Sequence, residues 1–191
     1  YVVNSYEVPH QYPTCSRCGN PIEFLAMREY YLKQVEYISI LRQYADKMTF
    51  YPLFMKQIWL DWLDAINIDW PISRRRYYGT EVPIWYCKEC GHPNLPPPGS
   101  YYRPWRDPPP FDKCSKCGSS KGFEGDTRTF DTWMDSSISE IYTLLHPHNR
   151  KDQEFFDTII SKRDYISDLR PQGKDIVRTW LHYTMLRGHQ L

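Results

Sequence analysis

The stretch DYISDLRPQGKDIVRTW, residues 164–180, is the part of the sequence that decides the fold. It reads as a short strand, a tight turn and the start of an amphipathic helix. Gly173 in the turn permits a ligand to approach the backbone closely, and Asp175 follows in the first helical turn. Ile176 and Trp180 lie one turn apart and share a helix face. In open α/β sheets such turns deliver backbone N–H groups to ligands.

Two interpretations of this turn remain open on the residues alone. Asp175 either accepts hydrogen bonds from the hydroxyls of a ribose or caps the helix, since Asp is favoured near helix N-termini. Ile176 and Trp180 either line a small apolar pocket or pack in the core, and core packing is the commoner fate of such a pair. The stretch therefore predicts a candidate nucleotide and side-chain site without excluding ordinary packing.

Hydrophobic periodicity predicts the elements around this stretch. Helices are expected at residues 28–48, 53–67, about 136–145 and 152–161, and strands at 82–86 and 127–132. The proline-rich residues 91–113 are expected to be irregular. Because strands and helices alternate, we expect an α/β fold with a parallel sheet that carries an insert.

Length and charge limit the possible classes of protein. The 191 residues fit one domain with a small insert, and a net charge of +1 provides no global field toward nucleic acid or membrane. No run of about 18 apolar residues is present, so we expect no membrane span. The N-terminal residues do not resemble a signal peptide and lack an initiator Met, so we expect a piece of a longer chain.

The cysteines form three copies of one unit, Cys-x-x-Cys-Gly. These units are CSRCG at 15–19, CKECG at 87–91 and CSKCG at 114–118. Cysteines at this spacing can direct both sulfurs at one metal ion, and the glycine permits the turn that follows. The pattern indicates thiolates in a reducing compartment rather than disulfides.

The second and third units together predict a four-thiolate zinc ribbon formed by Cys87, Cys90, Cys114 and Cys117. A closed set of four sulfurs leaves no open position on zinc, so the metal would be structural; the alternative is a set of free buried thiols. Cys15 and Cys18 are half a site. Their remaining ligands would be His10 or, as we expect, a cysteine pair outside this chain.

A zinc ribbon also suits a stand-alone nucleic-acid-binding module, which is one alternative function. That function needs basic and aromatic side chains along the ribbon edge. The candidates are Lys88, Arg103, Trp105, Arg106, Lys113 and Lys116. The acidic Glu89, Asp107 and Asp112 dilute this charge.

Three blocks, in this order, resemble the second half of the catalytic domain of the class I aminoacyl-tRNA synthetases of the valine, isoleucine and leucine group. They are DWPISRRRYYGTEVPIWYC at 69–87, DTWMDSS at 131–137 and LRPQGKDIVRTW at 169–180. The segment EVPHQYPTCSRCGNPIE, 7–23, resembles the chain returning from the inserted editing domain of this group. In combination the blocks are most similar to the valine-specific enzymes of archaeal type, with an isoleucine-specific core as the alternative.

The resemblance implies a partial Rossmann-like nucleotide-binding fold with helices and a zinc-ribbon insert. Residues 1–27 would be the return from the editing insertion, with its cysteine knuckle. Residues 28–86 and 119–191 would form the second half of the catalytic core, and 87–118 the zinc-ribbon insert.

The resemblance also implies roles for matched residues. Trp133, Ile176 and Trp180 would wall the pocket for the valine side chain, with Trp70 nearby. The ribose end of the aminoacyl-adenylate would be held by Gln172, Gly173 and Asp175. Residues that face the acceptor end of tRNA or brace the cleft would be Ser73, Arg74, Arg75 and Arg76, which are otherwise a solvated basic loop.

The implied activity is that of a cytoplasmic, monomeric ligase which uses valine, ATP with Mg²⁺, and tRNA, and which carries structural zinc. The group activates ATP with a His-x-Gly-His signature and a Lys-Met-Ser-Lys-Ser-like loop, and neither is found in this sequence. Charge stabilisation on the transferring phosphate depends on those motifs. We therefore expect no catalytic residue in this chain, and no catalysis by the chain alone.

Overall fold

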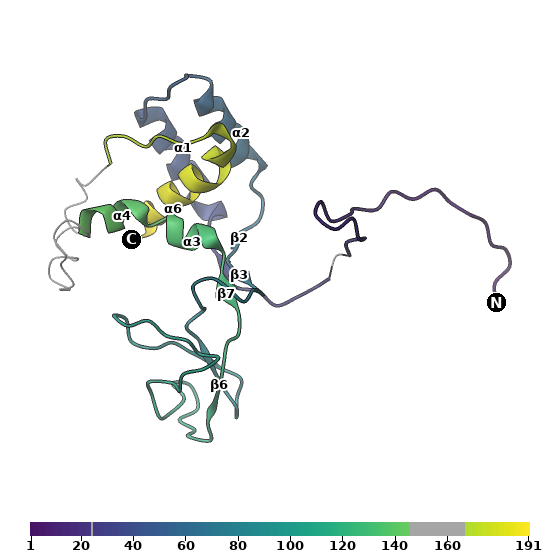
Figure 1. Ribbon diagram of the computed structural model, residues 1–191, viewed down its shortest axis with the longest axis vertical. Coiled ribbons are helices and arrows are strands. Elements are labelled where there is room, and N and C mark those ends of the chain that lie inside the picture. The colour runs from purple at the N-terminus through teal and green to yellow at the C-terminus, as the bar shows by residue number, and fades with distance from the viewer. Residues whose placement is uncertain (24, 146–166) are drawn as a thin grey trace.

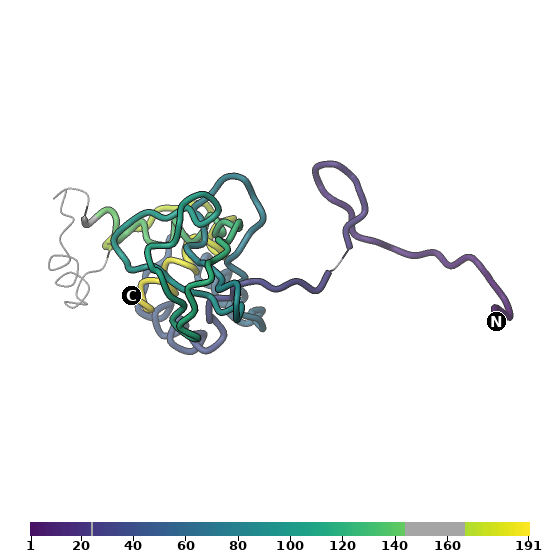
Figure 2. Tube along the Cα trace, turned by 90° about the horizontal axis from the view of Figure 1, so that it is seen from below, coloured from purple at the N-terminus to yellow at the C-terminus, as the bar shows by residue number. Residues whose placement is uncertain are grey.

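The computed structural model describes residues 1–23, 25–145 and 167–191. A group of helices lies at one end of the molecule and a small ribbon of strands at the other, and the N-terminal segment runs away from both (Figures 1 and 2). The helix predicted at 152–161 lies outside the described residues. In the part of the chain that is described, no helix has the length and apolar character to cross a membrane.

The first two helices pack against each other, and the first begins later than predicted. A 3₁₀ turn at Val35–Tyr37 leads into α1 (Ile38–Lys47), and α2 (Met55–Ala65) follows within its predicted range. The residues before them are extended, because β1 (Tyr31–Leu32) pairs with β2 (Trp70–Pro71). The predicted start of this helix at residue 28 is therefore wrong.

The C-terminal helix completes the core. It begins with a 3₁₀ turn at Lys174–Ile176, continues through a π-helical segment at Val177–Leu181 and ends as α6 (His182–Gln190). The π-helical segment packs against α2. Its apolar face joins those of α1 and α2 in one cluster, whose buried members include Leu41, Ala45, Trp59, Leu63, Val177, Leu181 and Leu186. The helix predicted after Gly173 is thus confirmed, whereas residues 167–173 contain no strand.

The strands of the described residues pair only in the antiparallel sense, so the predicted parallel sheet is wrong for this part of the chain. Besides the pair β1–β2, β3 (Ser73–Arg74) pairs with β7 (Thr129–Phe130). The three-stranded sheet has the order β5 (Pro93–Asn94), β4 (Trp85–Cys87) and β6 (Phe123–Gly125). Alternation of strands and helices is typical of parallel strands joined by crossover helices. Here β1 and β2, which are joined through α1 and α2, pair in the antiparallel sense instead.

The bounds of the ribbon, and of the helices that follow it in the chain, differ from those predicted. The ribbon sheet runs from Trp85 to Gly125 and is wider than the predicted insert. Its strand β5 lies within the stretch expected to be irregular. After β7 the chain forms α3 (Thr132–Ser136) and then α4 (Ser139–Leu145), in place of one helix from 136. The short helix α3 places the second motif beside the C-terminal helix.

A buried histidine links α6 to α2 and to the start of α1. The Nδ1 atom of His182 accepts a hydrogen bond from Trp59 Nε1 (3.4 Å), so the ring proton lies on Nε2, which donates to Gln34 Oε1 (3.0 Å). Gln34 in turn donates to the carbonyl of Ile68 (2.8 Å). Because Nδ1 accepts a hydrogen bond, it carries no proton, and the imidazole of His182 is neutral. Burial accordingly lowers the pKa of His182 to about 4.

Acidification is expected to destabilise the fold through this histidine. Its folded pKa of about 4 lies below the ordinary value of 6.5, so the unfolded chain takes up a proton first as the pH falls from about 6.5 to about 4. His182 should contribute a loss of about 2–3 kcal/mol between pH 7 and pH 4.5. Urea unfolding of the wild type and of His182→Gln at both pH values would measure it. Equal losses in the two proteins would contradict the assignment.

Candidate functional site

Asp131 joins the first two sequence motifs. This carboxylate is 8% exposed and stands at the N-terminus of α3, where its Oδ1 accepts from the backbone N–H of Trp133 (3.1 Å). Its Oδ2 accepts from Trp70 Nε1 (3.1 Å) and from the guanidinium of Arg74 (2.5 Å). One side chain therefore fixes the start of the helix that carries Trp133. Asp131 is not among the site residues predicted from the sequence, although its place just before a helix is a capping signal.

The two tryptophans bound to Asp131 differ in their surroundings. Trp70 is 1% exposed and stacks on Tyr183, with ring centroids 3.7 Å apart and planes 13° from parallel. Burial raises the pKa of Tyr183 to about 12, so the stack is neutral. Trp133 is half-buried and packs against the same core. Trp70 thus lies in the core, and Trp133 lies at the edge of that core.

Trp180 meets the helix that carries Trp133. The indole Nε1 of Trp180 donates to the backbone carbonyl of Ser136 (3.1 Å), which belongs to α3. Trp180 and Ile176 are each partly exposed rather than buried in the core. The structure therefore brings the second and third motifs side by side, with three of the predicted pocket residues on two neighbouring elements.

The turn before the C-terminal helix has the conformation of a compact bend. The carbonyl of Gly173 accepts from the N–H of Ile176 (3.2 Å). A Cβ atom at Gly173 would lie 2.6 Å from Asp175 Oδ1, so a side chain at this position would displace the exposed Asp175 carboxylate from its present place. No side chain caps the helix by a hydrogen bond, and Asp175 is exposed. The Oε1 atom of Gln172 is buried and has no hydrogen-bond partner among the described residues.

Exposure increases along the segment Ser73–Arg76, from a buried serine to two exposed arginines. Ser73 is 3% exposed; its Oγ accepts from the backbone N–H of Tyr30 (2.9 Å) and donates to Glu29. Arg74 donates to the carbonyl of Pro71 (2.6 Å) as well as to Asp131. Arg75 is exposed and pairs with Glu29, and Arg76 is exposed. The first two residues therefore brace the fold, although Arg74 is partly exposed, and the last two are exposed.

A polar network ties the base of the ribbon to the extended segment before β1. The hydroxyl of Tyr86 donates to Asp126 Oδ2 (2.8 Å), and Arg128 pairs with the same carboxylate (2.6 Å). Although burial opposes it, the Arg128 contacts lower the pKa of Asp126. The guanidinium of Arg128 also lies 4.7 Å from the ring centroid of Tyr30 and pairs with Glu29 (3.4 Å). Nothing in the local sequence identifies these long-range partners.

The four cysteines of the ribbon come together as predicted. All four Sγ atoms lie within 4.8 Å of one another, and the pairs Cys87–Cys117 and Cys90–Cys114 are each 3.7 Å apart. Zinc with bonds of about 2.3 Å to sulfur, arranged as a tetrahedron, requires S···S distances of about 3.8 Å. Backbone N–H groups, first that of Cys117, lower the pKa of Cys114 to about 6, whereas the neighbouring thiols raise the pKa of Cys117. The donor set and its dimensions fit zinc.

The N-terminal cysteine unit has the same backbone geometry as the two ribbon units. The N–H of Gly19 donates to the carbonyl of Cys15 (2.8 Å), just as that of Gly91 donates to Cys87 (2.8 Å) and that of Gly118 to Cys114 (2.9 Å). The three glycines have φ values of 73°, 68° and 70°. Within the described residues, neither His10 nor any other ligand forms a cluster with this pair.

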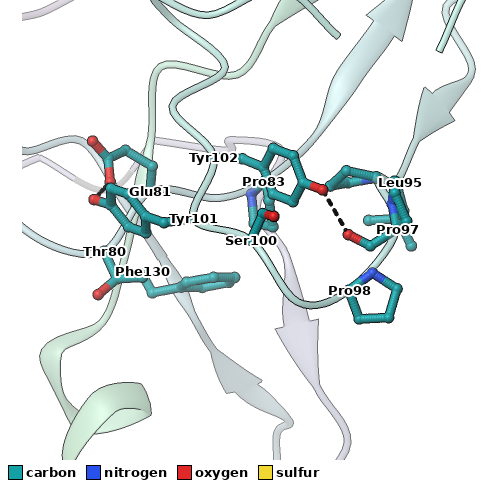
Figure 3. A pocket seen from close by; sticks show the side chains of 11 residues that line it. Thr80, Glu81, Pro83, Leu95, Pro97, Pro98, Ser100, Tyr101, Tyr102 and Phe130 are labelled. Carbon is teal, nitrogen blue, oxygen red and sulfur yellow. Dashed lines mark hydrogen bonds between the residues drawn. The ribbon is translucent and has the colours of Figure 1, made fainter. Parts of the chain in front are cut away.

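A cavity of about 310 Å³ lies between the proline-rich loop of the ribbon and β7 (Figure 3). Its walls are mostly apolar and include Pro83, Leu95, Pro97, Pro98 and Phe130. The hydroxyl of Tyr101 donates to Glu81, and that of Tyr102 to the carbonyl of Pro97 (2.9 Å). None of the residues predicted to bind valine or nucleotide lines this cavity.

The basic residues at the ribbon edge are partly committed to protein contacts. Arg103 and Arg106 both pair with Asp107 (3.4 and 2.9 Å), and the indole N–H of Trp105 donates to Glu81 (3.3 Å). These pairs reduce the positive charge available to a phosphate backbone. The ribbon edge therefore offers little support for the stand-alone nucleic-acid-binding module.

Comparison with known proteins places these features in a family. A family model described as tRNA synthetases class I (I, L, M and V) matches residues 20–191. Proteins named valine–tRNA ligase from Aeropyrum pernix and Pyrobaculum aerophilum are each 44% identical to the chain over its full length, which is 22% and 23% of those proteins. The valine–tRNA ligase of Nanoarchaeum equitans is 39% identical over 97% of the chain and 23% of its own length.

The chain thus spans between a fifth and a quarter of the length of these curated relatives. The motifs that meet at Asp131 and Trp180 all lie within the matched residues. Since the family model covers most of the chain and archaeal relatives align along nearly all of it, the chain belongs to the class I tRNA synthetases of the isoleucine, leucine, methionine and valine family.

Proposed function

We propose that this chain is part of a valine–tRNA ligase, in which it forms the amino-acid slot and the ribose side of the adenylate site. The observation that carries the proposal is the junction of α3 with the C-terminal helix, where Trp180 donates to Ser136 and Asp131 fixes Trp133. The names of the archaeal relatives support valine as the amino acid. The longer enzyme would join valine to ATP with release of pyrophosphate and then transfer the valyl group to tRNA.

The slot uses rigid walls to select the side chain. Trp133 and Trp180 supply flat indole faces, and Ile176 supplies a branched aliphatic surface one turn before Trp180. Trp70 supports them from the core, where its stack on Tyr183 holds it in place. Such walls disfavour a larger side chain by overlap, but they cannot strongly exclude threonine, which has nearly the shape of valine.

The turn at residues 172–175 would hold the ribose of the adenylate. The exposed Asp175 carboxylate has no capping role to fill, and the buried Oε1 of Gln172 lacks a partner among the described residues. A buried acceptor without a donor is costly, and a ribose hydroxyl would satisfy it. Gly173 keeps the backbone free of a side chain at this bend. These residues would lie in the second half of a Rossmann-like core, at residues 28–86 and 119–191.

The exposed Arg75 and Arg76 are the members of the basic segment that would face the acceptor end of tRNA. Their neighbours, the buried Ser73 and the partly exposed Arg74, would instead hold that segment against β7 and α3. ATP would arrive with Mg²⁺, and its phosphates would be bound by parts of the enzyme other than this chain. Within the chain, residues bind and orient the aminoacyl-adenylate, and we assign none of them a chemical step.

The four-cysteine cluster would hold one structural zinc ion, since its four sulfurs leave no position for a substrate. Zinc would cross-link the two knuckles of a ribbon whose strands are only two or three residues long. The pair Cys15–Cys18 has the backbone of a ribbon knuckle and would bind metal with ligands outside this chain, in the segment that returns from the editing insertion.

Removal of the Trp180 ring is expected to impair valine activation more than it impairs folding. In the longer enzyme, Trp180→Ala should raise the KM for valine in ATP–pyrophosphate exchange by roughly tenfold to a hundredfold, because one slot wall is lost. Trp180→Phe should have a smaller effect, and Trp105→Ala, on the ribbon, should have none. If stability and valine activation fell together and the KM for valine stayed constant, Trp180 would be a core residue only.

Comparison of amino acids in the same exchange assay tests the wider proposal. Valine should support exchange at lower concentration than isoleucine, and threonine should be activated weakly. A stronger response to isoleucine would favour the isoleucine-specific alternative. No exchange with either amino acid, together with tight binding of single-stranded RNA by the ribbon, would favour the nucleic-acid-binding module.

A further inference from the structure

Arg170 lies on the loop before the turn and covers one face of Trp180. Its guanidinium carbon is 4.0 Å from the centroid of the Trp180 ring, within the range of a cation–π contact. The side chain is only 10% exposed. Arg170 is therefore largely buried against a residue of the proposed slot, although no motif in the sequence marks it.

Both ends of the guanidinium fork are tied to other helices. One terminal nitrogen donates to Glu140 Oε1 on α4 (2.5 Å), and the other donates to Thr184 Oγ1 on α6. The remaining nitrogen, Nε, has no hydrogen-bond partner among the described residues. The position of Arg170 over the ring is thus set by two helices and not by the loop alone.

These contacts leave Trp180 little freedom. Its N–H edge is held by the carbonyl of Ser136, and one of its two faces is covered by Arg170. The side chain nevertheless stays partly exposed, so some ring surface remains open to a ligand. A ring fixed at its edge and on one face presents its remaining surface in a single orientation.

The geometry does not suit Arg170 for binding a phosphate group. Arginine binds phosphate by directing its two terminal nitrogens at the oxygens, and here both already donate to protein groups. Glu140 adds a carboxylate beside the guanidinium, which would repel an anion. Arg170 can therefore act on the proposed slot through its contact with the Trp180 ring.

We propose that Arg170 is a positioning residue for amino-acid selection, which holds the Trp180 ring so that the slot accepts valine and rejects the larger isoleucine. The proposal rests on the proposed function, because it assigns Trp180 to the slot. A wall that can tilt accommodates an additional methylene, whereas a fixed wall excludes it by overlap. Arg170 acts through Trp180 and touches neither the substrate nor the reacting atoms.

The test uses the full-length enzyme that contains this chain, with ATP–pyrophosphate exchange driven by valine or by isoleucine. Arg170→Met keeps the aliphatic stem and removes the charge and the fork. It should raise the KM for valine about fivefold and lower the preference for valine over isoleucine about tenfold. The KM for ATP and the kcat with valine should remain within about twofold.

Two further variants separate positioning from general stability. Arg170→Lys retains a cation for the ring and should recover most of the preference for valine. Arg178→Met removes an exposed arginine from the helix that carries Trp180 and should behave as the wild type. Thermal unfolding of each variant shows whether it folds, and Arg170→Gln, which also removes the charge and the fork, serves as the test if Arg170→Met does not fold.

The outcomes distinguish this inference from the function on which it rests. A wild-type enzyme that fails to respond to valine refutes the proposed function and, with it, the role of Arg170. An active wild type whose folded Arg170→Met or Arg170→Gln variant keeps the normal preference for valine refutes only the positioning role. Equal changes in the KM for valine, isoleucine and ATP would also overturn it, because they would show a general disturbance of the fold.

Discussion

Removal of zinc is expected to unfold the ribbon while the helical core stays folded. The ribbon strands contain two or three residues each, and sheets of such short strands are marginal in water. A structural zinc ion contributes on the order of 10 kcal/mol of apparent folding free energy to a small domain at neutral pH. Chelation should therefore expose the ribbon, including the buried Trp85, and leave the buried Trp59 of α2 shielded.

Metal analysis and limited proteolysis would measure this effect. Protein purified in the presence of zinc should carry one ion per chain at the ribbon, and a chelator should make residues 87–118 sensitive to protease. Cys114→Ser should reproduce that sensitivity without chelator. The matched control is Cys18→Ser, since it removes an equally spaced cysteine from the N-terminal knuckle. A metal-free protein with a protease-resistant ribbon would contradict the zinc assignment.

Substitution of Asp131 should give the largest loss of stability among the site residues. Asp131→Ala removes the cap of α3 and leaves the indole N–H of Trp70 and the charge of Arg74 without their acceptor. Loss of one partner from a largely buried ion pair is expected to cost about 3 kcal/mol, after allowance for the partial exposure of Arg74. Urea denaturation would measure the change in the free energy of unfolding.

Two variants show whether charge or hydrogen bonding dominates at Asp131. Asp131→Asn keeps an acceptor for the helix cap but loses the charge that pairs with Arg74, so we expect roughly half of the loss. Asp135→Ala removes an exposed carboxylate from the same helix, which accepts from Thr80 (2.8 Å), and should cost less than about 1 kcal/mol. Comparable losses at Asp131 and Asp135 would disprove the central role of Asp131.

The elements that the sequence predicted well are those whose signal is local. The position of the ribbon cluster follows from the Cys-x-x-Cys-Gly spacing, because two residues and a glycine suffice to form a knuckle. The helix after Gly173 follows from the apolar spacing of Ile176 and Trp180. The bounds of α2 follow from the same periodicity.

The elements that were predicted wrongly depend on partners far away in the chain. Tyr31 has a place in an apolar helical pattern, yet it pairs with Pro71 in a strand, and only the folded chain brings the two together. The parallel sheet failed for the same reason, since strand direction depends on which strands become neighbours. Asp131, Arg128 and Arg170 were missed as contact residues because a charged side chain carries no signal of its partner.

The pairing of β1 with β2 has a consequence for the evolution and assembly of this chain. The two strands hold the ends of the α1–α2 excursion side by side, so this pair of helices leaves and rejoins the body at one point. The tip of the excursion, near Tyr51 and Leu53, is exposed and remote from that closure. A segment closed in this way can change in length at its tip without shifting Trp70, whereas its helices complete their packing only once the C-terminal helix has reached them.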